Sequence, residues 1–108
     1  MQTQIIIGTI SVEATAALIR QRFVGFTGAI AAPAAPAIGI SELDMDTGEM
    51  APINTHGALM VKAGAAIAVG AEVEVGADGK AITLASGVAQ GRALDAATAD
   101  GDIIRILR

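Results

Sequence analysis

The chain has 108 residues, 53% of them hydrophobic and 17% charged, with a formal net charge of −4 and a pI near 4.7. This length allows one domain, residues 1–108, and the absence of cysteine excludes disulfides, thiolate zinc sites and cysteine nucleophiles. The acidic balance argues against nucleic acid as a partner, because phosphate binding requires clustered lysine and arginine.

The apolar side chains are mostly alanine, with two Phe and no Trp or Tyr. Small side chains bury little area, and burial stabilises by roughly 25 cal/mol per Å², so we expect the chain to associate with copies of itself. The N-terminal run 1–10 has no basic region and does not resemble a signal peptide. The most apolar tract, 28–40, is interrupted by Pro33 and Pro36 and is too short to span a membrane.

Thirteen glycines divide the sequence into segments that are mostly too short for helices. This rhythm predicts a mainly β fold, a small barrel-like or sandwich-like domain built of short hairpins. Leu18 to Phe26 is predicted to be a strand that places Arg20 and Arg22 on one face. A helix over Val12 to Arg22 is the weaker alternative, because Val12, Ala16, Ile19 and Phe23 have helical spacing.

The segment 28–37 is rich in Ala and Pro, and its prolines favour extended backbone. We expect an extended arm or loop here. An uncharged segment of this kind is suited to docking against a partner through Ala32 and Ala35, and a poorly ordered linker is the alternative.

Three turn signals predict three hairpins. Asp46-Thr47-Gly48-Glu49 separates residues 38–43 from 50–53, and Asp100-Gly101 separates 94–98 from 103–107. The clearest signal is Asp78-Gly79 between two short alternating runs. A two-residue type I′ turn there pairs Val75 with Ile82 and Val73 with Leu84, so that the branched side chains share one face.

No catalytic or metal-binding pattern emerges, so we expect neither an enzyme nor a cofactor. The single histidine, His56, lies in a turn-like sequence, and a lone turn histidine is most often a surface residue. The acidic group Glu42, Asp44, Asp46 and Glu49 lacks the order of a calcium loop. Lys80 beside its turn is superficially similar to the modified lysine of lipoyl and biotinyl carrier domains, but Gly79 displaces it from the tip.

Residues 91–107, ending in Asp100-Gly101-Asp102-Ile103-Ile104-Arg105-Ile106-Leu107, closely resemble the ending of a family of capsid cement (decoration) proteins of tailed bacteriophages. Residues 61–73 and the Asp-Gly-Lys turn fit the same pattern. The resemblance covers about 38–107, and 4–26 match more loosely.

This resemblance implies a virion protein on the outside of an icosahedral head, placed between capsomers and stabilising the shell. It implies the major capsid protein as partner and no catalytic residue. It also implies homo-oligomers that are commonly trimers, although some families of decoration proteins are dimers or monomers. Arg20, Arg22, Arg92 and Arg105 are candidate contacts to acidic groups of the capsid or a neighbouring subunit. The rival functions are a head-fibre base or tail component, and then a carrier domain.

Overall fold

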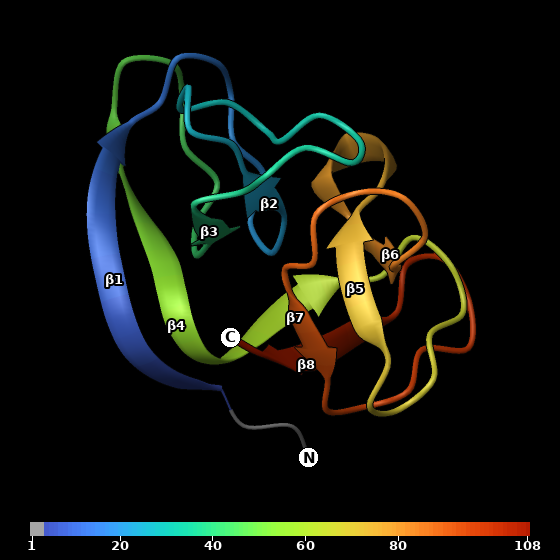
Figure 1. Cartoon of the computed structure of the whole chain (residues 1–108). Helices are drawn as coiled ribbons and strands as arrows, with labels where there is room; N and C mark the ends of the chain where they lie inside the picture. The colour runs from blue at the N-terminus through green and yellow to red at the C-terminus, as the bar shows by residue number, and fades with distance from the viewer. Residues whose placement is uncertain (1–3) are drawn as a thin grey trace.

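The computed structural model describes residues 4–108. In this part of the chain all regular structure is β apart from one 3-10 turn, which confirms the predicted fold class (Figure 1). The elements are β1 (Ile5–Glu13), β2 (Phe23–Val24), β3 (Gly39–Ser41), β4 (Met50–Lys62), β5 (Glu72–Val75), η1 (Ala77–Gly79), β6 (Ala81–Thr83), β7 (Gly91–Ala93) and β8 (Ile103–Leu107).

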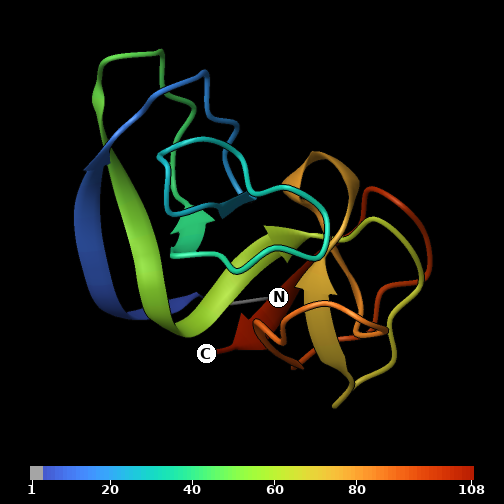
Figure 2. The ribbon, with the colours of Figure 1, turned by 45° about the horizontal axis from the view of Figure 1, so that its top comes forward.

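The strands form one antiparallel sheet in the order β2-β3-β4-β8-β7-β5-β6, and β1 pairs with the remaining edge of β4. The long strand β4 joins two parts of the molecule. Its first half pairs with β1 and β3, and its second half pairs with β8. Figure 2 shows β4 curving between the ribbon that it makes with β1 and the smaller strands β5 to β8.

The core lies against the inner face of this sheet and consists of two clusters of small and branched side chains. In the second half of β4, Leu59 and Val61 point inward and are fully buried, and Ile104 and Ile106 of β8 lie beside them. The second cluster, around Leu18, lies between the first half of β4 and the chain before β2. Period-two burial in β4 and β8 therefore defines an inner and an outer face.

The predicted strand 18–26 is wrong over most of its length, because only β2 is a strand there, and the alternative helix is absent as well. Gln21 has a φ of +61°, which interrupts extended backbone. Its N–H donates to the Ser41 carbonyl and its own carbonyl accepts from Lys62, so two neighbouring strands hold it in this conformation. As a result Arg20 is exposed and Arg22 is buried, and they share no strand face.

Of the two forms predicted for 28–37, arm and loop, the structure has the loop. Backbone bonds from Ala31 to Phe23 and from Ala34 to Val75 fasten it to the body. Ala31 and Ala37 are buried, whereas most of the tip 32–36 is exposed.

The Asp78-Gly79 turn is confirmed, but the register predicted for its hairpin is wrong. Both turn residues have positive φ, and the Lys80 N–H donates to the Ala77 carbonyl. The Gly76 N–H also donates to the Lys80 carbonyl. Gly76 and Ala77 therefore both face Lys80, as in a β-bulge.

This bulge shifts the pairing by one residue, so that Val73 faces Thr83 instead of Leu84, and Val75 faces Ala81. Glu74 pairs with Ile82, and this residue is 5% exposed because it lies beneath the segment around Gly87. Val73, Glu74 and Val75 are all buried, so both faces of β5 are covered beyond Glu72, and the predicted polar face of Glu72, Glu74 and Thr83 does not form.

The two other hairpins are confirmed as antiparallel pairs with different bounds. β3 pairs with β4 across the turn at 46–49, and β4 continues to Lys62. β7 pairs with β8, but its strand residues are 91–93, so the predicted strand 94–98 is wrong. His56 is exposed as expected, yet it lies inside β4 and not in a turn, because β1 pairs along this part of the strand.

Candidate interaction surface

The outward side chains of the sheet form one continuous surface, which we call the outer face. Antiparallel partners point to the same side, so the register places Ile5, Ala58, Leu107, Arg92 and Glu72 in one row across five strands. A second row holds Met60, Arg105 and Leu94, and a third holds Lys62 and Ile103.

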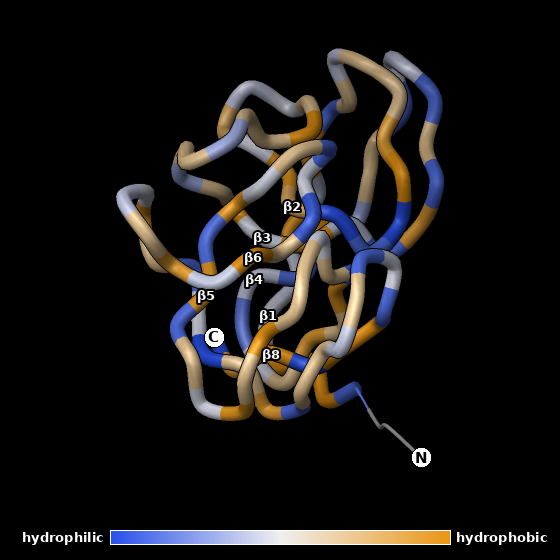
Figure 3. Tube along the Cα trace, turned by 90° about the vertical axis from the view of Figure 1, so that its right-hand side faces the viewer, coloured by the Kyte–Doolittle hydropathy of each residue, from blue (hydrophilic) through white to orange (hydrophobic). Residues whose placement is uncertain are grey.

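The outer face is unusually apolar for a solvated sheet. Antiparallel sheets that face water normally alternate apolar-in and polar-out. In β8 the outward side chains of Ile103 and Leu107 are apolar, like the buried ones between them, and Leu107 is 54% exposed. Figure 3 shows a further hydrophobic stretch at the start of β1, after a short hydrophilic piece of the chain. Apolar groups clustered at a surface are typical of a site for protein contact.

Two of the four sequence-predicted arginines, Arg92 and Arg105, lie together on this face. Arg92 donates to Glu72 (2.9 Å) and to the Gly70 carbonyl (3.1 Å). Arg105 makes a two-point contact with Asp95, through Nε (2.9 Å) and Nη2 (3.1 Å), and these hydrogen bonds raise the pKa of Arg105. Both guanidiniums are therefore held in fixed orientations between apolar side chains.

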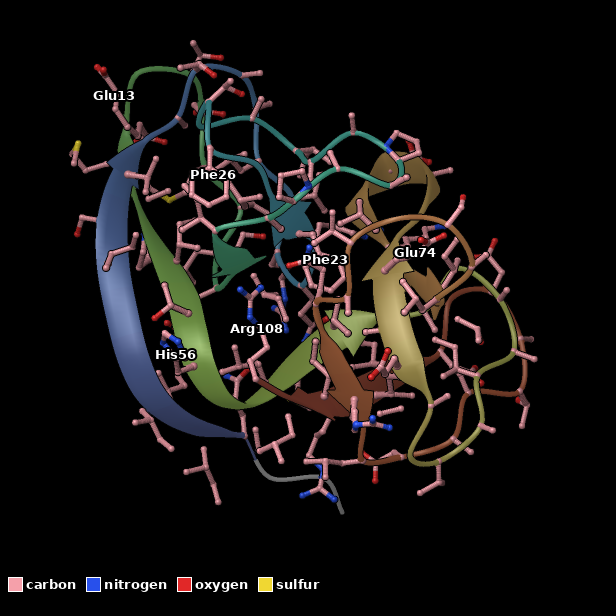
Figure 4. All side chains as sticks on the ribbon, viewed as in Figure 1. Glu13, Phe23, Phe26, His56, Glu74 and Arg108 are labelled. Atoms are coloured by element: carbon pink, nitrogen blue, oxygen red, sulfur yellow. The ribbon has the colours of Figure 1, made fainter. Side chains whose placement is uncertain are left out.

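A hollow of about 360 Å³ lies at the end of the first row, lined by Glu72, Ala89, Gly91, Arg92, Leu107 and Arg108. Arg108 reaches from here toward the interior, where Nη2 donates to the carbonyls of Ala37 (3.4 Å) and Ile38 (3.3 Å) (Figure 4). Burial lowers the pKa of Arg108. Through these two hydrogen bonds to backbone carbonyls, Arg108, which directly follows β8, links the end of that strand to the end of the loop 28–37.

The remaining predicted site residues lie elsewhere. Arg20 is exposed on the loop before β2, where its backbone N–H donates to Asp44. Arg22 is 9% exposed, and its Nε has no hydrogen-bond partner among the described residues. Ala32 and Ala35 line a second hollow, of about 290 Å³, together with Phe26 and Pro36.

Sequence reasoning missed the apolar members of the outer face, above all Ile103 and Leu107. A signal for them was present, because four of the five residues of β8 are apolar, and such a strand has apolar groups on both faces. Lys62 was missed as well, and only the register with Ile103 places it here.

The chemistry of the other polar groups is modest. Lys80 pairs with Asp100 at 3.0 Å, and its side chain is only 21% exposed, so it is not presented at a turn tip as in a carrier domain. Within residues 4–108, no three His, Asp or Glu side chains are grouped to hold a metal ion, and no helix is long and apolar enough to cross a membrane.

The fold and its outer face define a small antiparallel β-domain whose most developed surface feature is an apolar face that carries two paired arginines. The sequence pattern of the phage cement protein family matches residues 1–108, the whole chain. The chain therefore belongs to the phage cement protein family, and it is a structural component of a phage head.

Comparison with solved structures gives a match to the crystal structure of the head fiber gp8.5 N base in bacteriophage phi29. The TM-score is 0.76 at 22% sequence identity, over 93% of this chain and 92% of that chain. At this identity the likeness establishes a shared fold. No curated protein matches the chain.

Proposed function

We propose that the protein binds the outer surface of a phage capsid between capsomers and stabilises the head, as a homo-oligomer for which we favour three subunits. Family membership supports the location on the head. The observation that carries the proposal is the outer face, where Leu107 and Ile103 are exposed beside guanidiniums that Glu72 and Asp95 already hold in place.

The outer face supplies two kinds of contact to the major capsid protein. Burial of its apolar side chains provides affinity, and Arg92, with its side chain 63% exposed, offers further N–H donors to capsid carboxylates. We place Arg105 beside it. Arg20 lies away from this face, on the loop before β2, and we assign the buried Arg22 a role within the fold. Several such contacts in one oligomer bind adjacent capsid subunits far more tightly than one contact does, because later contacts form within the same complex.

The test is the variant Leu107→Asp, with Leu43→Asp as its matched control. Leu43 is 52% exposed, almost as much as Leu107, but it lies in the loop between β3 and β4. We expect Leu107→Asp to reduce occupancy on heads that lack the protein at least tenfold, because a charge would be buried without a partner. Leu43→Asp should bind like wild type. Equal occupancy of the two variants, with unchanged melting curves, would refute this placement of the capsid contact.

A second candidate function is the base of a head fibre. The observation that favours it is the likeness of fold to the phi29 head fiber base over almost the whole chain. Electron microscopy of virions with and without the protein distinguishes the two functions. A cement role predicts compact density close to the shell, whereas a base predicts density from which a fibre projects.

A further inference from the structure

The outer edge of β1 is open. Among the described residues β1 pairs with β4 alone, and its side chains are exposed or half-buried along the whole strand (Figure 1). No charged residue occurs from Ile5 to Val12, and Ile7 is 77% exposed. Edge strands of soluble proteins are normally protected by charges, prolines or shortness. This strand has nine residues, its only charge is Glu13 at the far end, and its pairing with β4 is irregular only around Gly8. The apolar residues Ile5, Ile6 and Ile7 are therefore unprotected, which indicates that another protein surface covers them.

A second uncharged surface lies in the loops around β2. The hollow of about 290 Å³ is lined by Phe26, Ile30, Ala32, Ala35 and Pro36, with Gly25, Thr27 and Ala31. Phe26 is 71% exposed at its edge. No charged residue occurs from Phe23 to Ser41. The hollow is lined by small and apolar groups, so it is suited to bind aliphatic side chains.

The two surfaces cannot meet within one molecule. The hollow lies beyond the C-terminal end of β1, because the Thr15 N–H donates to the Gly28 carbonyl (3.0 Å). Ile7 precedes Glu13 by six residues, about 20 Å of extended chain. Figure 4 shows Phe26 and Glu13 in the upper part of the view, far from the start of β1.

We infer that the start of β1 in one copy, with Ile6 and Ile7, docks into the Phe26–Pro36 hollow of the next copy. This inference rests on the proposed homo-oligomer and specifies its contact. Both surfaces are free of charge, whereas the outer face carries arginines and a lysine, so the two contact types are chemically distinct. A contact between two different surfaces repeats from copy to copy and forms a ring when the rotation closes, as a trimer requires.

The size of the contact also favours a ring over an isolated pair. The exposed parts of Ile6, Ile7 and Ile10 amount to about one and a half whole isoleucine residues. That is little compared with a stable interface, which buries roughly 800 Å² on each partner. In a ring every subunit makes two such contacts, one through its strand and one through its hollow, and closure makes the last contact intramolecular.

The experiment uses complementary variants of the full chain without capsids. Ile7→Asp damages only the strand surface, and the double variant Ala32→Asp/Ala35→Asp damages only the hollow. Sedimentation velocity should show wild type and the control Leu43→Asp as the same oligomer, and each damaged variant at least tenfold weaker in self-association. An equimolar mixture of the two damaged variants should associate more than either variant alone, as a two-subunit species, because one intact strand still meets one intact hollow. This pair should be weaker than the wild-type oligomer, because a single contact forms and no ring closes.

Three outcomes would overturn the inference. A hollow variant that assembles like wild type while Ile7→Asp does not would indicate that β1 pairs with β1 of another copy. Two variants that assemble normally but lose capsid binding would place these surfaces against the shell and leave the proposed function intact. Absence of any oligomer in wild type would also overturn it. Melting curves confirm folding, and Phe26→Asp replaces the double variant if that variant unfolds.

Discussion

Gly79 offers a sharp test of how the β5–β6 turn is packed. Its φ is +71°, and a Cβ at this position would lie 2.7 Å from Ile30 Cγ2 and 3.0 Å from the Phe23 carbonyl oxygen. The change Gly79→Ala therefore adds strain of the backbone and a collision with β2. The turn would be pushed away from the neighbouring strand, or the side chain of Ile30 would have to move.

The magnitude follows from these two terms. Left-handed backbone costs a residue with a Cβ about 1 to 2 kcal/mol, and a methyl group forced into a packed site costs about 1 to 3 kcal/mol. We expect Gly79→Ala to lower the free energy of unfolding by about 2 to 5 kcal/mol, and Gly79→Val by more. Gly70→Ala is the matched control, because Gly70 has a φ of +82° and open space around it, so only the strain applies.

Urea unfolding of wild type, Gly79→Ala and Gly70→Ala at one protein concentration measures both terms. The loss for Gly79→Ala minus the loss for Gly70→Ala gives the steric part directly. Equal losses would show that the turn does not press on β2, and an unchanged midpoint for both would refute the left-handed turn itself. The protein concentration must be held fixed, because association adds to apparent stability.

Two further predictions concern carboxylates. Glu74→Ala should lower the free energy of unfolding by about 1 to 3 kcal/mol, because the Gly87 N–H loses its buried acceptor. Glu72→Ala, on the exposed face, should lower it less. Equal urea midpoints of the two variants would contradict this prediction. Hydrogen bonds from Thr98 hold the pKa of Asp102 below its ordinary value, so its contribution to stability is present at neutral pH and is lost as pH falls through the folded-state pKa. Stability of wild type should therefore decline more steeply than that of Asp102→Asn as pH falls below about 4, and parallel urea midpoints would count against the bonded carboxylate.

Part of the fold could be predicted from the residue types in short segments of the sequence. Positive φ at Asp78 and Gly79 follows from the residue types alone, because Gly and Asp tolerate left-handed backbone better than most residues. The turn at 46–49 could also be predicted from its residue types, and the mainly β fold class from the spacing of the glycines. The register of the β5–β6 hairpin could not be predicted, because the bulge at Gly76 depends on a hydrogen bond to the Lys80 carbonyl that has no sequence signature.

Long-range contacts decided the rest of the candidate surface. The sequence by itself determined that the chain is a small acidic β-protein without cysteine, that it resembles phage cement proteins, and that Arg92 and Arg105 are candidates for contact. Only the tertiary structure joined them with Ile5 and Leu107, because a row across five strands is set by register between segments up to about a hundred residues apart. It likewise buried Arg22, since the conformation of the preceding residue, Gln21, is imposed by bonds from two distant strands.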